Sequence, residues 1–567
     1  MSEGAGVRGN QPASRRQRLP ATVLIAFLLA LKPAHATISP PPVHPGTGRT
    51  PAVRPVVQEA PPRLIVVVVI DQFRADLLSR LRGRFGSNGF NRLLREGANF
   101  TSCFYPYALT ETAPAHATLA TGTTPDRHGI VSNSWYDTRR GRMIQAIEDE
   151  SSPILGGAST IPGASPRALV GTTLADELSL ATQGKARIFG VALKDRAAIL
   201  STGHAAAGAF WYDIQTGRFV SSKYYGETLP AWVETFNERR LADAYYGKDW
   251  VIDGRTVVSL RSRSGKADPE FYENLPYTPF VHDYLFEFTR ELVVREGLGA
   301  DATPDFLFIG LSGHDWLGHR DGPYSRSLEE MTVRTDLLLA DLLGFLDRRM
   351  GRSGYWFALS ADHGIAPTLE QAAPLRLRGL PLDLRHVRQE MEEALAARWG
   401  AGDWFLQPDR SRQLWFNRDR LSELRVSPAE AAHVTGEAAL RVDGVLGYFS
   451  PAESTLGSAM TEAYRLSTFS GRSPDLILAL EPFTVVAGEF AADHGTPYTY
   501  DTHVPLILLG PVFRAGAYRE RVSPADLAPT LAAALGITPP ALANGRVLIE
   551  ALAEGPGRPS QSRGAGP

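Results

Sequence analysis

The residues best suited to chemistry in this sequence are aspartates and histidines that stand beside short apolar runs. In chain order they are Asp71, Asp315, His319, Asp362, His363 and His494. Carboxylate and imidazole groups without thiolate form a ligand set that suits zinc, and suits manganese or iron less well. The chain has one cysteine, Cys103, so it can build neither an intramolecular disulfide nor a cysteine-based metal site. The sequence therefore predicts a metal site made of histidine and carboxylate side chains.

The spacing of these residues supports a shared site. Asp315 and His319 are four positions apart, so one turn of helix would point both side chains at one ion. Asp362 and His363 are adjacent, which suits a turn that follows a strand. Each residue alone has a structural explanation, and Asp71, for example, could simply cap a helix. Several such residues at one edge of a sheet argue against coincidence.

The apolar runs next to these residues predict buried strands. They are short, continuous and rich in β-branched residues, as in strands covered on both faces, and they span residues 63–70, 306–310, 355–360, 475–480 and 504–509. Helical patterns lie between them, at 73–81, 327–348 and 525–535. Buried strands that alternate with helices predict an α/β fold with a mainly parallel central sheet flanked by helices. Ligands of such sheets bind at the carboxyl ends of the strands, where we expect the aspartates and histidines to meet.

Composition and charge agree with a globular protein. Of the 567 residues, 43% are hydrophobic and 21% are charged, which excludes a largely disordered, fibrous or coiled-coil protein. Lys and Arg total 59 and Asp and Glu total 61, so the near-neutral balance gives no reason to expect a nucleic-acid partner. Length alone allows three or four domains, but one elaborated α/β domain also fits. We expect that domain at 63–554, with capping insertions at 137–304 and 366–474 that shape a pocket.

The first 36 residues have the pattern of a secretory signal peptide. An arginine-containing stretch at 14–20 precedes an apolar run at 21–31, and the segment 34–36 (Ala-His-Ala) is a small-x-small cleavage site. An uncleaved anchor is the alternative, although the run is short for a bilayer span. A proline-rich linker is predicted at 37–62 and a flexible tail at 555–567. We therefore expect a periplasmic or secreted protein with no stable membrane insertion after cleavage.

A motif centred on a threonine lies between the first two aspartates. It reads Thr-x-Pro-x-His from Thr112 to His116, then Thr-Gly-x-x-Pro-x-x-His-Gly at 121–129, and then Asn133. This region resembles the nucleophile region of the alkaline phosphatase superfamily. It is most similar to the branch with a threonine nucleophile, which includes some bacterial alkaline phosphatases and the nucleotide pyrophosphatase/phosphodiesterases. The aspartates and histidines at the strand ends match the same superfamily in order, so the resemblance spans residues 63–548.

The resemblance implies a site with two Zn²⁺ ions. One ion would be held by Asp315, His319 and His494, and the other by Asp71, Thr112, Asp362 and His363. Coordination to a cation turns a threonine hydroxyl into a competent nucleophile, and a second cation stabilises charge on the leaving oxygen. Thr112 would become a phosphothreonine that water then cleaves, while Asn133 donates a hydrogen bond to a phosphoryl oxygen. Taken alone, Thr112 could cap a helix and Asn133 could be a turn residue.

Lys194 and Arg196 indicate a phosphate monoester as the substrate. They follow an apolar run at 188–193, and two residues so spaced on a strand face the same side. The Leu-Lys-x-Arg-Ala pattern resembles the pair with which threonine-type alkaline phosphatases bind phosphate, and diesterase relatives lack it. Extra cations favour the doubly charged monoester. We predict an exported zinc alkaline phosphatase acting on small-molecule phosphate monoesters, with a phosphodiesterase or nucleotide pyrophosphatase on the same core as the alternative.

The sequence does not settle which histidine is the last zinc ligand. His503 lies close to His494 in the chain, and either could be the last zinc ligand, although the His-Gly turn before the strand favours His494. No catalytic role is assigned to His116, His128 and His314. Sulfatases of this superfamily need a cysteine or serine at the nucleophile position, which here holds threonine. We expect a monomer, and the sequence leaves the physiological substrate and a third metal open.

Overall fold

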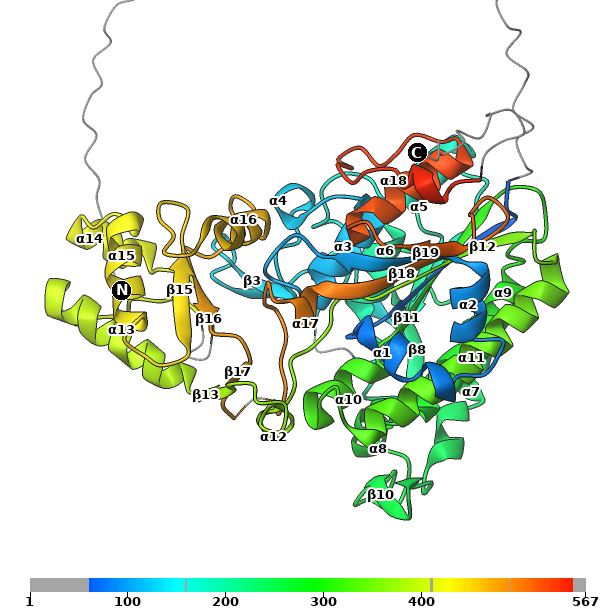
Figure 1. Cartoon of the computed structure of the whole chain (residues 1–567), viewed down its shortest axis with the longest axis horizontal. Coiled ribbons are helices and arrows are strands. Elements are labelled where there is room, and N and C mark those ends of the chain that lie inside the picture. The colour runs from blue at the N-terminus through cyan, green and yellow to red at the C-terminus, as the bar shows by residue number, and fades with distance from the viewer. Residues whose placement is uncertain (1–60, 159–160, 408–410, 489, 554–567) are drawn as a thin grey trace, which may run out of the picture. The chain divides into compact units, whose positions relative to one another are not determined.

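Ten strands form the central sheet of the protein. The computed structural model describes residues 61–158, 161–407, 411–488 and 490–553 (Figure 1). The strand order is β19-β2-β18-β12-β1-β11-β6-β7-β8-β5, in which β19 is Gly516–Tyr518, and five of the nine neighbouring pairs are parallel. The predicted signal peptide, all but the last two residues of the predicted linker, and the predicted tail lie outside the described residues.

β1 (Leu64–Ile70) lies inside the parallel part of the sheet, with a parallel neighbour on each side. Its sequence is β-branched almost throughout and every residue is buried, as expected for a strand covered on both faces. It pairs in parallel with β11 (Asp305–Leu311) on one side and with β12 (Tyr355–Ser360) on the other. β6 (Ile188–Ala192) and β7 (Gly208–Asp213) continue the parallel set beyond β11. The three strands predicted in this part of the sheet are therefore confirmed.

β18 (His503–Leu509) has the opposite direction to β12, and it also pairs antiparallel with β2 (Ala98–Phe104). Ser360, at the carboxyl end of β12, pairs with Leu506 near the start of β18. Because the two directions are opposed, the chain that enters β18 lies at the carboxyl edge of the parallel strands. Residues just before β18 can therefore meet residues that follow β1, β11 and β12.

Helices cover both faces of the sheet, which confirms the predicted α/β class (Figure 1). α3 (Thr112–Thr121) packs against α6 (Asp195–Thr202) and α18 (Leu527–Leu535) on one face, and α9 (Phe280–Arg295) packs against α11 (Arg326–Met350) on the other. The predicted helix 73–81 is shorter in the structure, where α1 is Asp76–Arg80. Within the described part of the chain, no helix combines the length and the apolar character needed to cross a membrane.

β16 (Leu476–Leu480) does not join the central sheet, so the expectation that all five apolar runs share one sheet is wrong. It lies between β14 (Gln413–Leu414) and β15 (Val445–Phe449) in a separate antiparallel sheet. α13 (Leu384–Trp399) and α15 (Pro428–Ala439) enclose with this sheet a second hydrophobic core. An apolar run indicates burial, but it does not indicate which sheet provides it.

The stretch 137–304 also differs from the expected capping insertion. β5 (Ile154–Leu155), β6, β7 and β8 (Arg218–Ser222) all come from this stretch, yet they extend the central sheet. β7 reads Gly-Ala-Phe-Trp-Tyr-Asp, and its aromatic residues suit a strand without forming an aliphatic run. This part of the chain therefore carries the strand that leads to Lys194 and Arg196, in addition to loops around the pocket.

Two leucines on α11 provide a test of this packing. Leu342 is fully buried, whereas Leu337 is 47% exposed. We expect Leu342→Ala to destabilise the protein by about 2–5 kcal/mol, because it leaves a cavity in the core. Leu337→Ala should change the stability by no more than about 0.5 kcal/mol. Thermal unfolding followed by fluorescence measures both, and equal shifts of the two variants would contradict the packing described here.

Candidate active site

The predicted polar residues meet at the carboxyl edge of the parallel strands, where a pocket of about 860 Å³ opens. The pocket is lined by seven of them, namely Thr112, Asn133, Lys194, Arg196, Asp315, His319 and His494. The other three are almost completely buried beside it, and they are Asp71, Asp362 and His363. The structure thus gathers all of the predicted site residues into one place.

Asp71, Asp362 and His363 form one group of candidate metal ligands. Nε2 of His363 lies 3.6 Å from Oδ1 of Asp71 and 3.5 Å from Oδ2 of Asp362. Burial and the neighbouring Asp362 carboxylate raise the pKa of Asp71 to about 7, and burial raises the pKa of Asp362 to about 6. Among the described residues, no hydrogen-bond partner is found for Nε2 of His363, Oδ1 of Asp71 or Oδ2 of Asp362. Buried groups without partners are costly, and a bound cation would remove that cost.

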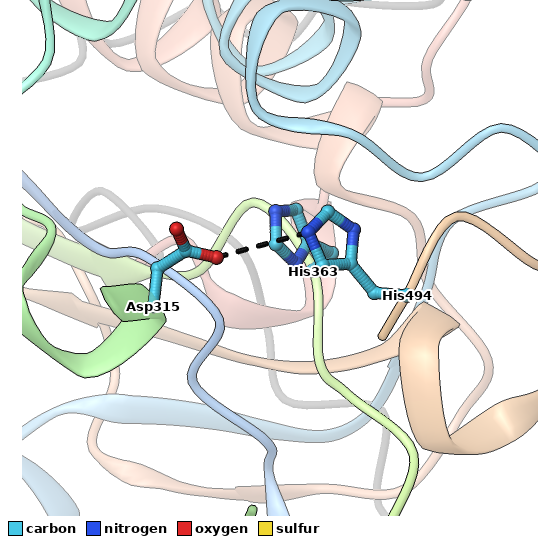
Figure 2. Close-up of side chains that lie close together, drawn as sticks. All are labelled: Asp315, His363 and His494. Atoms are coloured by element: carbon cyan, nitrogen blue, oxygen red, sulfur yellow. Dashed lines mark ion pairs between the residues drawn. The ribbon is translucent and has the colours of Figure 1, made fainter. Parts of the chain in front are cut away.

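Asp315, His319 and His494 meet beside this group. Asp315 and His319 lie one turn apart on α10 (Gly313–Asp321), as their spacing predicts. Nε2 of His319 is 3.2 Å from Oδ1 of Asp315, and Nε2 of His494 is 3.7 Å from the same oxygen. The His494 ring stacks on His363 with 3.6 Å between the ring centroids. The two groups therefore adjoin, as Figure 2 shows for Asp315, His363 and His494.

Backbone carbonyls fix the tautomer of the three histidines. Nδ1 of each lies within 3.0 Å of a carbonyl oxygen, which belongs to Ala492 for His319, to Gly364 for His363 and to Thr110 for His494. A carbonyl oxygen only accepts hydrogen bonds, so Nδ1 carries a hydrogen, and in the neutral ring the lone pair is on Nε2. Histidine ligands of metals are commonly oriented in this way. The Nε2 atoms and the unpartnered carboxylate oxygens fit divalent cations.

The other histidines lie outside these groups. Nε2 of His503 donates to the carbonyl oxygen of Thr101 over 3.0 Å, and its ring stacks on Phe104 with 4.3 Å between the centroids. This placement favours His494 over His503 as a ligand. His116 donates from Nδ1 to the carbonyl oxygen of Thr112 over 2.8 Å, and burial lowers its pKa to about 4. A neutral His116 therefore supports the backbone at Thr112.

Thr112 is the first residue of α3, so its hydroxyl lies where helix N–H groups and the helix dipole favour an anion. Oδ1 of Asn133 accepts a hydrogen bond from the backbone N–H of Ala113 over 2.9 Å. Because this bond uses the oxygen of the Asn133 side chain, its NH₂ group is suited to donate a hydrogen bond to a ligand. Oε2 of Glu111 accepts from the N–H of Asn133 over 2.8 Å and from the hydroxyl of Ser132 over 2.7 Å. Glu111 therefore positions the Asn133 segment.

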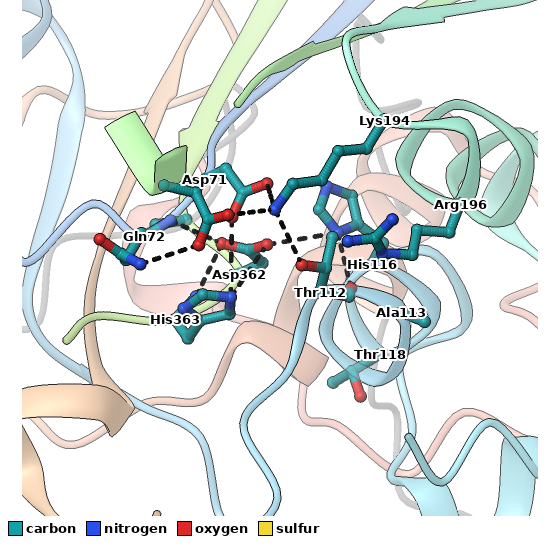
Figure 3. Close-up of polar contacts among 12 residues, drawn as sticks. Asp71, Gln72, Thr112, Ala113, His116, Thr118, Lys194, Arg196, Asp362 and His363 are labelled. Atoms are coloured by element: carbon teal, nitrogen blue, oxygen red, sulfur yellow. Dashed lines mark hydrogen bonds and ion pairs between the residues drawn. The ribbon is translucent and has the colours of Figure 1, made fainter. Parts of the chain in front are cut away.

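Lys194 reaches both groups of carboxylates (Figure 3). Its Nζ lies 2.7 Å from Oδ2 of Asp71, 2.6 Å from Oδ2 of Asp315 and 3.3 Å from Oγ1 of Thr112. Burial acts to lower the pKa of Lys194, but the carboxylates of Asp315 and Asp71 outweigh it and raise the pKa above its usual value. The ammonium group therefore stays charged.

The expectation that Lys194 and Arg196 lie on a strand is wrong. β6 ends at Ala192, Lys194 is the N-cap of α6, and Arg196 is in the first turn of that helix. The short turn between strand and helix still places both side chains in the pocket. Nη1 of Arg196 lies 3.5 Å from Oδ1 of Asp195, and its buried Nε has no hydrogen-bond partner within the described ranges.

Three site residues were missed by sequence reasoning. Glu111 immediately precedes Thr112, Asp493 immediately precedes His494, and Gln72 immediately follows Asp71. Asp493 forms a further group of candidate metal ligands with His319 and His494. Gln72 donates hydrogen bonds to the carboxylates of Asp362 and Asp315. Their only signal in the sequence is that each stands next to a candidate residue.

A family model described as type I phosphodiesterase / nucleotide pyrophosphatase matches residues 65–504, and the chain belongs to this family. The chain is 31% identical to alkaline phosphatase PhoV of Synechococcus elongatus over 519 residues. This alignment covers 87% of this chain and 93% of that protein. It is also 30% identical to alkaline phosphatase PafA of Elizabethkingia meningoseptica over 525 residues, an alignment that covers 87% of this chain and 94% of that protein. The resemblance inferred from the Thr112 motif is confirmed.

Solved structures of PafA have the same fold. The wild-type crystal structure matches with a TM-score of 0.79 at 28% identity, covering 87% of this chain and 99% of that one. A solved variant of PafA is substituted at one threonine, one asparagine, one lysine and one arginine. The first two are separated by 21 positions and the last two by 2, as Thr112 is from Asn133 and Lys194 from Arg196.

Metal uptake should strengthen as the pH rises from about 6 to about 9. Burial acts to lower the pKa of His319, but the Asp315 carboxylate outweighs it and raises the pKa to about 9. Below that pH a cation must displace the proton of His319, and below about pH 7 it must also displace the proton of Asp71. Calorimetric titration with Zn²⁺ in two buffers of different ionisation enthalpy counts the released protons. An affinity that does not change with pH would contradict this assignment.

Proposed function

We propose that the protein is an exported, zinc-dependent alkaline phosphatase that hydrolyses small-molecule phosphate monoesters through a phosphothreonine at Thr112. One Zn²⁺ would be held by Asp315, His319 and His494, and the other by Asp71, Thr112, Asp362 and His363. The sequence similarity to two alkaline phosphatases over most of the chain supports the reaction class. Zinc is proposed because the donors are imidazole nitrogens and carboxylate oxygens.

The observation that carries this proposal is the position of the Thr112 hydroxyl. It lies at the start of α3 and accepts a hydrogen bond from Lys194, whose ammonium group also contacts Asp71 and Asp315. One hydroxyl thus lies between two groups of carboxylate and imidazole ligands, at the wall of an open pocket. This is the arrangement that nucleophilic attack on a phosphoryl group requires.

The proposed reaction has two displacements at phosphorus. Divalent cations bound here would lower the pKa of the attacking hydroxyl and stabilise the leaving oxygen. Oγ1 of Thr112 bonds to phosphorus as the bond to the ester oxygen breaks, and the alcohol leaves with a proton. Water then attacks the phosphothreonine, which releases inorganic phosphate and restores the hydroxyl. The Asn133 amide and the start of α3 offer hydrogen-bond donors to the phosphoryl oxygens in both steps.

The preference for monoesters rests on Lys194 and Arg196. A monoester carries two negative charges on its phosphoryl group and a diester carries one, so additional cations in the pocket favour the monoester. Both residues line the pocket beside Thr112. A phosphodiesterase or nucleotide pyrophosphatase on the same core is the second candidate, because the family model that matches the chain is described by those activities.

Export is proposed from the N-terminal pattern of charged, apolar and small residues. A periplasmic or secreted protein would act on phosphate esters outside the cytoplasm, as a monomer. Expression of the full chain followed by cell fractionation and N-terminal sequencing tests both the location and cleavage after Ala36.

Thr112→Ala should reduce phosphatase activity by at least about 10³-fold, because it removes the attacking oxygen. Thr112→Ser keeps a hydroxyl and should retain part of the activity. Acid quenching during turnover of p-nitrophenyl phosphate, followed by mass spectrometry of the peptide around residue 112, should find one added phosphoryl group. A wild-type protein that turns over substrate without that modification would exclude the covalent route.

Lys194→Ala should reduce hydrolysis of p-nitrophenyl phosphate by roughly 10²–10³-fold and reduce hydrolysis of bis-p-nitrophenyl phosphate much less. The reason is that the ammonium group compensates the second charge, which only the monoester carries. Lys223→Ala is a matched control, since Lys223 pairs with Glu227 at an exposed position. Each measurement is repeated after chelation, which should abolish activity. If the wild-type protein prefers the diester, the second candidate function holds instead.

A further inference from the structure

Gln72 occupies an unusual position in the site. It directly follows Asp71 at the end of β1, it is 1% exposed, and its backbone has a positive φ of 62°. Residues other than glycine rarely adopt this conformation, and where they do the surrounding structure must enforce it. The unusual backbone of Gln72 therefore calls for contacts that hold it.

Gln72 makes those contacts with one carboxylate from each ligand group. Its backbone N–H donates to Oδ1 of Asp362 over 3.0 Å. Its side-chain Nε2 donates to Oδ1 of Asp315 over 2.8 Å. Asp362 follows β12 and Asp315 lies on α10, so Gln72 links two segments that are separate in the sequence. Figure 3 shows the amide turned toward the site.

The fit around Gln72 is specific for its side chain. Gly318 on α10 leaves the space in which the amide lies, because a Cβ atom there would come within 1.7 Å of Oε1 of Gln72. A glutamate at position 72 would place a carboxylate against Asp315, and an asparagine would be one methylene too short to reach it. Size, hydrogen-bond donor and neutral charge are thus all constrained at this position.

We propose that Gln72 is a positioning residue that fixes the Asp315 carboxylate relative to Asp362, so that the two ligand groups bind their cations as one preformed pair. This inference rests on the proposed two-metal function. The amide hydrogen bond holds one oxygen of Asp315 and sets the plane of the carboxylate. The backbone hydrogen bond does the same for Asp362. Partners of this kind orient metal ligands, and their loss commonly weakens metal binding by about 10–100-fold.

The test compares metal binding by the wild-type protein with Gln72→Met and Gln72→Glu. Methionine keeps the length and volume without the donor, and glutamate adds a charge that repels Asp315. The protein is stripped with a chelator and titrated with Zn²⁺ against a competing chelator, and separately with Co²⁺, whose visible spectrum reports the coordination geometry. We expect Gln72→Met to bind one metal equivalent about 10-fold more weakly or worse, with an altered Co²⁺ spectrum.

Gln407→Met is the matched control. Gln407 is also buried, and its Oε1 accepts a hydrogen bond from the N–H of Trp415 in the segment with the second core. This variant should lose stability without losing metal affinity. The inference is wrong if Gln72→Met keeps the wild-type Zn²⁺ affinities and the wild-type Co²⁺ spectrum. It is also wrong if Gln72→Met and Gln407→Met lose the same amount of Zn²⁺ affinity. If the wild-type protein itself binds no pair of Zn²⁺ ions, the proposed function fails first.

Discussion

The crowding of negative charge at the carboxyl edge of the sheet is the constraint on which the rest of the site depends. Asp71, Asp315 and Asp362 are almost fully buried, and like charges in such an environment repel strongly unless cations accompany them. The ammonium group of Lys194 contacts two of them, at 2.7 and 2.6 Å. The contacts of Lys194 and the raised pKa values of Asp71 and Asp362 all follow from a fold that forces these carboxylates together.

The rigidity needed to hold them comes from the sheet. β1 is buried along its whole length and pairs in register with both β11 and β12, so the loops that follow these strands start from fixed points. The N–H of Asp71 donates to the carbonyl oxygen of Leu311, and the N–H of Gly364 donates to that of Asp501. The first bond extends the order of the sheet one residue beyond β1, and the second holds the loop that follows β12, which carries Asp362 and His363.

The sequence predicted those parts of the site that depend on local spacing. Asp315 and His319 lie one turn apart because four residues make one helical turn, and Thr112 begins a helix as its motif indicates. Gln72, Glu111 and Asp493 were missed because their roles depend on contacts through space that no local pattern contains. Lys194 and Arg196 were placed in the pocket but on the wrong element, since a two-residue turn separates the five-residue strand from the next helix. β16 was assigned to the wrong sheet for a similar reason, because an apolar run specifies burial and not its partner.

The antiparallel entry of β18 has a consequence for how the protein matures. It brings His494, from near the end of the chain, against Asp315 and beside the residues that follow β1. A cation held by Asp315, His319 and His494 would tie the segment that follows β11 to the segment that precedes β18, in a chain whose single cysteine rules out an intramolecular disulfide for that purpose. Metal loading would then follow the folding of both segments, and the bound cation would act as a cross-link that stabilises the folded state.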